Sequence, residues 1–335
     1  MSGFIPVCMY PTTVALVDDE PRLLELLTLD IAAFSVCKTF QEPNDALKFL
    51  ADNNTSQKSF TALCVSQSEE SSMDERNIQV GISKVHEQVF NKERFHEVSL
   101  AIIDYAMPGM NGVELCQKLQ GLRCKKMMLT GEADEQTAVD AFNDGLIDAF
   151  HRKGDADMAS KLSYVVKEEI FKYFQSQSEI ITKSLIDSPD HCPACLCDKA
   201  FVSYLKELIE REKISEYYLF NNDGYFLVVH ENGATSWLII KNEAEMALLE
   251  ELVSYVHEEE PSEVSQKVLD GIKARESILF ALDADQTNRP VDEWQDYVYP
   301  VQKEEIWGNV YYVALVKDPK TFDEKLKGIT TFRDL

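Results

Sequence analysis

The sequence predicts an α/β doubly wound domain with a five-stranded parallel sheet, followed by an α+β domain with an antiparallel sheet. Three observations favour this fold. Short apolar segments alternate with amphipathic ones over the first half of the chain. Acidic or hydroxyl side chains directly follow several of these apolar segments. Two hairpin signals, NNDG and ENG, separate apolar segments in the second half, and 335 residues suffice for two hydrophobic cores.

The first half contains five predicted strands, each followed by a predicted helix. Residues 13–17 are a short, largely apolar run, and the next segment, PRLLELLTLDIAAF, is amphipathic, with Pro21 at its helix start. Residues 35–40 predict a second strand and residues 44–50 a second helix. The alternation continues with strands at 99–103, 126–129 and 148–152 and helices at 112–120, 136–143 and from 155 onward.

Residues 53–95 interrupt this alternation. They include NNTSQKSF and SQSEESSMDERN, which are rich in Ser, Gln and Glu and lack a sustained apolar period. We therefore expect an insertion in the first domain, before its third strand.

The last helix of the first half has two possible roles. Its apolar residues keep helical spacing to about residue 185, and Ser188-Pro189 ends the pattern. The helix could pack on the first domain or extend from it to form a dimer. We expect a first domain at 12–175, a linker at 176–198 and a second domain at 199–335.

The second domain begins with a predicted helix at 199–212 and continues with three apolar strands joined by the two hairpin signals. Aromatic residues alternate along these strands, which favours the core of a sheet over a ligand cage. Helices at 243–257 and 261–273 and strands at 297–302 and 309–316 complete the prediction.

The charge and hydropathy of the chain exclude several classes of partner. The net charge of −25 divides into −11 for residues 1–157 and −14 for residues 158–335, and the second half contains no basic recognition helix. Such acidity makes duplex DNA an unlikely partner for the second domain. The chain has neither a run of about 20 apolar residues nor a basic, cleavable leader, so we expect a cytoplasmic protein with no membrane partner.

Five polar side chains directly follow predicted strands of the first domain. They are Asp18, Asp19, Asp104, Thr130 and Lys153. Because the carboxyl ends of parallel strands meet at one edge of the sheet, these residues should lie close together. Three neighbouring carboxylates repel one another, and a hard cation such as Mg²⁺, which prefers oxygen ligands, relieves that repulsion.

The strings LVDDE, IIDYAMPGMNG, MMLTG and FHRKG occur in this order and resemble the receiver domain of bacterial two-component response regulators over residues 12–175. The resemblance implies a Mg²⁺-dependent phosphorylation of Asp104. It further implies that Asp19 and Asp104 ligate Mg²⁺ directly, that Asp18 holds it through water, and that the backbone carbonyl of Ala106 completes the protein ligands.

The same resemblance assigns the switch and the phosphoryl contacts. Thr130 and Lys153 contact the phosphoryl oxygens, and Thr130 with Phe150 forms the element that responds to phosphate. Lys153 is followed by Gly154, where the family usually has proline. The sequence of this loop therefore departs from the family pattern, and its geometry does not follow from the resemblance.

The implied function is a phosphorylation-controlled switch. A histidine kinase or phosphotransfer protein donates the phosphoryl group, the chain forms a phosphorylation-dependent homodimer, and the second domain engages a partner protein or a small ligand. The dimer would bury an apolar stripe of Leu162, Val166, Ile170 and Phe174, which we expect a monomer to leave partly exposed. Apart from assisting its own phosphorylation and dephosphorylation, the chain is not expected to be an enzyme. The alternatives are a transcription factor and an output enzyme.

The whole chain also resembles a quorum-sensing response regulator, because an insertion-bearing receiver precedes an output domain without a helix-turn-helix.

A second candidate metal site lies between the domains. The segment HCPACLC offers His191, Cys192, Cys195 and Cys197. Structural zinc sites usually combine two separated pairs of ligands, whereas these four residues crowd into seven positions. A structural turn is the favoured interpretation, and zinc remains the alternative.

Overall fold

The computed structural model describes residues 3–56, 60–67, 78–131, 134–153, 158–187, 192–280, 290–317, 326 and 328–335. Two units are distinguished by their internal packing. We call the first the α/β unit, which comprises Met9–Val65 and Asn91–Glu179. We call the second the α+β unit, which comprises Met1–Cys8, Ser66–Phe90 and Ile180–Leu335.

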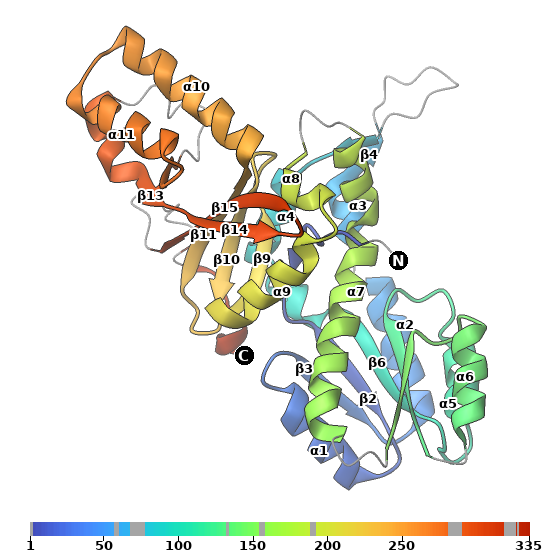
Figure 1. Ribbon diagram of the computed structural model, residues 1–335. Coiled ribbons are helices and arrows are strands. Elements are labelled where there is room, and N and C mark those ends of the chain that lie inside the picture. Colours follow the sequence, from blue (N-terminus) through green and yellow to red (C-terminus); the bar gives the residue numbers. More distant parts are fainter. Residues whose placement is uncertain are drawn as a thin grey trace. The chain divides into compact units, whose positions relative to one another are not determined.

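The α/β unit contains the predicted five-stranded parallel sheet (Figure 1). Its strand order is β3-β2-β6-β7-β8, and every neighbouring pair is parallel. Strands β2 and β6 are buried along their whole length, as expected for inner strands covered by helices on both faces. The strands are β2 (Thr13–Val17), β3 (Val36–Phe40), β6 (Val98–Asp104), β7 (Lys125–Thr130) and β8 (Ala149–Arg152).

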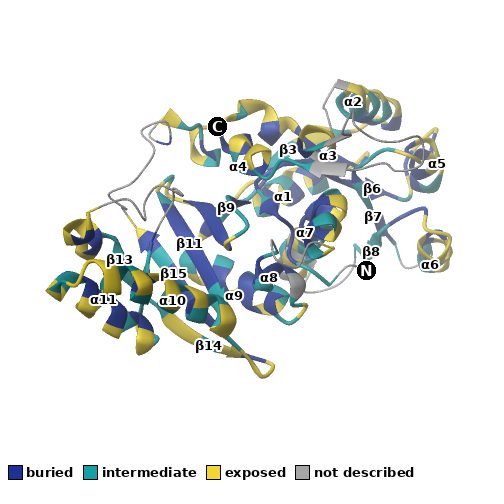
Figure 2. Ribbon diagram, turned by 90° about the horizontal axis from the view of Figure 1, so that it is seen from above, coloured by how far each residue is buried: buried dark blue, intermediate teal, exposed yellow. Residues whose placement is uncertain are grey.

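Helices cover both faces of this sheet, as Figure 2 shows. On one face, α2 (Pro43–Ser56), α5 (Gly112–Lys118) and α6 (Glu135–Asn143) pack with the strands in a single buried cluster. On the other face lie α1 (Pro21–Ile31) and α7 (Met158–Ile186). The doubly wound class predicted from the sequence is confirmed.

Helix α7 buries the apolar stripe that the sequence analysis assigned to a dimer. Leu162 and Val166 are completely buried, and Ile170 and Phe174 are buried too. The ring of Phe174 meets that of Tyr10 edge-on, with 4.7 Å between the centroids. The expectation that a single chain leaves this stripe partly exposed is wrong, because the stripe already forms part of the core of the α/β unit.

The α+β unit is built on a six-stranded sheet in the order β1-β9-β10-β11-β15-β14. The predicted antiparallel meander is present as β9, β10 and β11, and the remaining neighbours of known register, β11 with β15 and β15 with β14, are also antiparallel. Its strands are β1 (Cys8–Met9), β9 (Ile214–Leu219), β10 (Tyr225–His230), β11 (Thr235–Asn242), β14 (Gln302–Ile306) and β15 (Asn309–Lys317).

Aromatic side chains of the meander form the core of this unit, as predicted. Tyr217, Tyr218, Phe226 and Trp237 are all buried. Around the sheet lie α8 (Ala194–Cys197), α9 (Phe201–Glu212), α10 (Glu243–Glu259), α11 (Glu263–Lys273), the 3₁₀ helix η6 (Val291–Tyr297) and a small ladder of β12 (Ser277–Leu279) with β13 (Val298–Pro300). No helix among the described residues is both long and apolar enough to cross a membrane.

The division into units differs from the predicted boundaries. The predicted first domain includes all of residues 53–95, yet Ser66–Phe90 packs with the α+β unit. The contact runs through α4 (Ser83–Glu87), where the ring of His86 lies 4.5 Å from that of Phe220. The predicted linker at 176–198 contains the end of α7 and all of α8. The first residues also join the second unit, since the amide of Leu219 donates to the carbonyl of Val7 at 2.7 Å.

Candidate functional site

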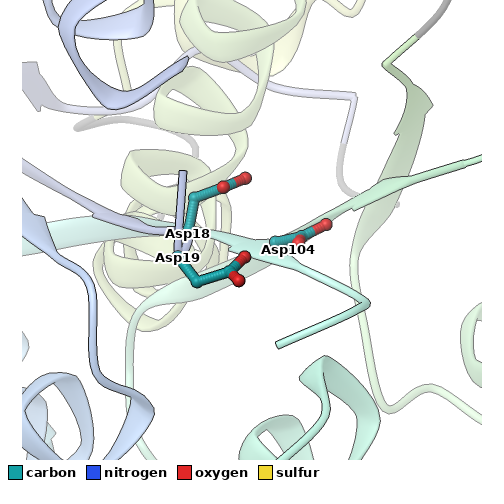
Figure 3. Close-up of side chains that lie close together, drawn as sticks. All are labelled: Asp18, Asp19 and Asp104. Carbon is teal, nitrogen blue, oxygen red and sulfur yellow. The ribbon is translucent and has the colours of Figure 1, made fainter. Parts of the chain in front are cut away.

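Three aspartates converge at the carboxyl ends of β2 and β6. Asp18 and Asp19 directly follow β2, and Asp104 is the last residue of β6. These strands are parallel neighbours with Val17 paired to Ile103, so the residues after them are adjacent. One carboxylate oxygen from each aspartate lies within 4.8 Å of the others, and the three groups extend to the same side in Figure 3. The convergence predicted from the strand order is therefore present.

Lys153 joins two of the three aspartates. Its ammonium nitrogen lies 2.7 Å from Oδ2 of Asp18 and 2.7 Å from Oδ1 of Asp104. The backbone amide of Lys153 donates to the carbonyl of Thr130 at 3.0 Å, which holds the start of the loop after β8 against the end of β7. The side chains of Asp18 and Asp104 are buried, whereas Asp19 is exposed.

Burial and the neighbouring charges oppose each other in this cluster. Burial raises the pKa of the Asp104 carboxyl above its usual range, Lys153 acts in the opposite direction, and the charge of Asp18 raises it further. For Lys153, burial lowers the pKa, but hydrogen bonds and charges from Asp104 and Asp18 outweigh it and the net pKa is raised. One ammonium therefore leaves the acidic cluster short of positive charge, and a further cation would stabilise it.

The remaining predicted residues surround this cluster. Thr130 ends β7, is completely buried, and donates from Oγ1 to the carbonyl of Gly131 at 3.0 Å. Ala106 is exposed and its backbone amide donates to the Asp104 carboxylate, which lowers the pKa of that group. Phe150 is half-buried on β8, and its ring centroid lies 6.1 Å from that of Phe142. Gly154 lies outside the described residues.

Gly112 has a role that the sequence analysis did not identify. In the predicted fold it is only the first residue of the helix at 112–120. A Cβ atom at this position would lie 2.3 Å from the backbone oxygen of Asp104. The Gly112 amide also donates to the carbonyl of Tyr105 at 2.9 Å, which folds the loop back onto the end of β6. The segment PGMNG contains residues typical of turns, but the close approach of Gly112 to the Asp104 carbonyl is known only from the structure.

The structure leaves the second metal candidate open. His191 lies outside the described residues, as does the side chain of Cys197. Cys195 is buried and Cys192 is half-buried. Within the described part of the chain, Asp18, Asp19 and Asp104 are the one group of three or more such side chains close enough to share a metal ion.

Similar proteins occur among known families and solved structures. Residues 62–161 match the model of the response regulator receiver domain. The solved structure of the response regulator LqsR from Legionella pneumophila is 30% identical, with a TM-score of 0.76, over 98% of this chain and 94% of LqsR. A response regulator receiver domain protein from Clostridium thermocellum is 17% identical, with a TM-score of 0.32, over 48% of this chain and 94% of its own. The search of curated proteins found no match.

The LqsR alignment extends over both units, whereas the family model matches part of the first half. The resemblance read from the four sequence strings is thus confirmed. The chain belongs to the response regulators of two-component signalling.

Proposed function

We propose that Asp104 accepts a phosphoryl group from a histidine kinase or phosphotransfer protein in a Mg²⁺-dependent reaction, and that this modification switches dimerisation and the interactions of the α+β unit. One observation carries the proposal. Asp104 lies beside two further aspartates and within 2.7 Å of the Lys153 ammonium, at the edge of the sheet where parallel strands end. This is the arrangement that phosphoryl transfer requires, because the phosphoryl oxygens need cationic partners.

The donor set fits Mg²⁺. The three side chains offer carboxylate oxygens within 4.8 Å of one another, and hard oxygen ligands are those that Mg²⁺ prefers. Asp19 and Asp104 would hold the ion directly, Asp18 through water, and the Ala106 carbonyl would complete the set. When bound, Mg²⁺ supplies positive charge beside the reacting oxygens.

The side chains of the protein perform the remaining tasks. An Asp104 oxygen forms a bond to phosphorus while the phosphorus–nitrogen bond of the donor phosphohistidine breaks, and the donor imidazole keeps the electron pair of that bond. Lys153 then exchanges its contact with Asp104 for one with a phosphoryl oxygen. The Thr130 hydroxyl, which donates to Gly131 in this structure, turns to the phosphoryl group, and Phe150 turns inward behind it.

Labelling with acetyl phosphate tests the site. Asp104→Asn abolishes the added phosphate seen by intact-protein mass spectrometry, because an amide does not form the acyl phosphate. Asp19→Asn and removal of Mg²⁺ by a chelator also abolish it. Asp140→Asn, on the exposed surface of α6, is the matched control and labels like the wild type. Full labelling of the Asp104 variant would refute the assignment.

We propose that the dimer uses exposed side chains of α6 and α7, which cover the two faces of the sheet, rather than the buried stripe. Phe142 on α6 is 43% exposed and Tyr164 on α7 is 67% exposed. The contact between Phe142 and Phe150 links α6 to the switch residue. Light scattering after chromatography, with Mg²⁺ and beryllofluoride as the phosphoryl mimic, should show a dimer that both Asp104→Asn and Tyr164→Ser weaken. A mass that stays monomeric at tens of micromolar would mean that the switch acts within one chain.

For the α+β unit we propose binding of a partner protein or a small ligand. In this proposal the chain catalyses no other reaction than the phosphorylation and dephosphorylation of its own receiver. The net charge of −14 over residues 158–335 supports this proposal over a phosphorylation-controlled transcription factor. An output enzyme is the other alternative.

A further inference from the structure

An apolar face of α10 is exposed to solvent. Leu248, Leu252 and Tyr255 are 66%, 45% and 64% exposed. They follow one another at intervals of four and three residues, so they form one stripe along the helix. Met246 and Val253, on the opposite side, are buried where α10 packs against its unit. In Figure 1, α10 lies at the periphery of the α+β unit beside α11.

The charges around this stripe all have one sign. Helix α10 contains six glutamates and neither lysine nor arginine. Three of the glutamates are engaged elsewhere. Glu243 and Glu250 each form an ion pair with Arg275 at 2.8 Å, and Glu245 caps the start of the helix.

The other three glutamates border the stripe. Glu251 lies three residues after Leu248 and four before Tyr255, and Glu258 and Glu259 follow Tyr255 on the same side. All three are exposed, and within the described ranges none of them forms an ion pair with a lysine or arginine. The face thus combines exposed apolar side chains with an acidic border.

This combination restricts the occupant. An anionic membrane or a nucleic acid would bring negative charge to a border that is already negative. A second copy would place two such borders together, in a protein whose net charge is −25. A basic partner has complementary charge, and apolar anchors at helical spacing would cover the stripe. We propose that the outer face of α10 docks a basic amphipathic helix of a partner protein.

This docking site specifies the partner proposed for the α+β unit. It rests on the proposed function in one respect, that the α+β unit binds a protein. Binding is therefore measured on the full chain without a phosphodonor. The probe is a fluorescent synthetic peptide of Leu and Lys with the Leu residues at helical spacing. One control peptide has the same composition in an order that breaks this spacing, and another replaces Lys with Glu.

The docking variant is Leu252→Gln with Tyr255→Gln. The matched control is Leu26→Gln with Leu29→Gln on α1, where both side chains are likewise exposed, at 60% and 76%. Anisotropy titration should show the Kd of the Leu-Lys peptide raised about tenfold by the docking variant and changed less than about twofold by the control. Glu251→Gln with Glu258→Gln should raise it about threefold and reduce its dependence on salt.

Four results would overturn the proposal: equal affinity of the docking variant and the wild type, equal loss in the α1 variant, equal binding of the peptide without helical spacing, or equal binding of the Leu-Glu peptide. Sedimentation showing that the unmodified chain dimerises, and that the docking variant does not, would assign the face to a second copy instead. Peptide binding that persists while Asp104 fails to accept phosphate would refute the proposed phosphorylation and leave this inference standing.

Discussion

At the carboxyl ends of the parallel strands, Asp18 and Asp104 share the Lys153 ammonium at 2.7 Å. At the amino ends of the same sheet, Glu97 is also buried, but its nearest partners are hydroxyl groups. Tyr10 donates to Oε2 at 2.6 Å and Tyr173 donates to Oε1 at 2.5 Å. Glu97 immediately precedes β6, and Asp104 ends it, so one strand carries both arrangements.

The two ends of the sheet differ in whether the partners of the buried carboxylate can move. Burial raises the pKa of both Glu97 and Asp104. Hydrogen bonds from two tyrosines, and to a smaller extent the charge of Arg123, lower the pKa of Glu97, whereas Lys153 lowers that of Asp104. Tyrosines fixed in the core hold Glu97 between the segment before β2 and α7. A lysine side chain at the mouth of the site can move to a new anion. Under the proposed function, Asp104 can react because its compensating charge, Lys153, is able to move, whereas Glu97 is structural because its partners are packed in place.

The largest effect should come from removing the mobile charge. Lys153→Ala should retain Mg²⁺ binding but reduce the beryllofluoride-induced change in hydrogen exchange of the segment after β7 about tenfold, because its charge acts on the phosphoryl oxygens. Calorimetry with Mg²⁺ provides the binding control. Lys125→Ala is the matched control variant. The side chain of Lys125, at the start of β7, is about as exposed as that of Lys153 and forms an ion pair with Asp148 at 3.0 Å. An unchanged response in the Lys153 variant would show that Lys153 does not act on the phosphoryl group.

The second effect concerns the fixed partners. Glu97→Ala leaves the buried hydroxyls of Tyr10 and Tyr173 without their acceptor and should lower the free energy of unfolding of the α/β unit by about 3 kcal/mol. Urea denaturation, read by hydrogen exchange of β6 peptides, measures this loss. Glu97→Gln keeps an acceptor and should cost only about 1 kcal/mol. Equal effects of the two variants would show that the hydrogen bonds do not hold the cluster together.

A third, smaller effect has the opposite sign. Asp104→Asn removes a carboxylate whose ionised form is disfavoured by burial and by Asp18, so it should raise the free energy of unfolding by about 1 kcal/mol. The same denaturation assay measures the gain. A loss of stability would place Asp104 with Glu97 as a structural group and remove the distinction drawn above.

The smallest effect is a change in pH dependence. Because burial raises the pKa of Glu97, the folded chain binds a proton at higher pH than the unfolded chain. Ionised Glu97 therefore costs stability above the folded-state pKa, and this cost disappears as the pH falls towards the ordinary value of 4.5. On acidification from neutral pH, the wild type should gain stability relative to Glu97→Gln. A difference that stays constant, or that changes in favour of the variant, would contradict the assigned direction.

The sequence was sufficient for the parallel sheet and for the convergence of its three aspartates, because both depend on local pattern. An apolar run such as residues 99–103 predicts a buried strand, and a polar residue directly after it marks the carboxyl end of that strand. Five such residues determine an edge once the strands are parallel. The position of each side chain within the cluster could not be predicted from the sequence. That Lys153 bridges Asp18 and Asp104, for example, is known only from the distances in the structure.

Other features depend on contacts that no local pattern records. Strand β1 has two residues, too few for a period, and is recognisable only by its pairing with β9. Glu97 lies in the string RFHEVSL, where polar and apolar residues are mixed, and this string gives no sign that the carboxylate is buried between two tyrosines. The same limit applies to α7, where helical spacing fitted both a packed helix and a free one until burial decided between them.

The membership of Ser66–Phe90 in the α+β unit has a consequence for how this protein is made and how it can be divided. On a ribosome, these residues emerge well before β9, whose neighbour Phe220 packs against His86. The contact between His86 and Phe220 can therefore form only after more than a hundred further residues have been synthesised, and the same holds for Val7, whose carbonyl accepts from Leu219. A cut after Glu179 would separate His86 from Phe220 and Val7 from Leu219.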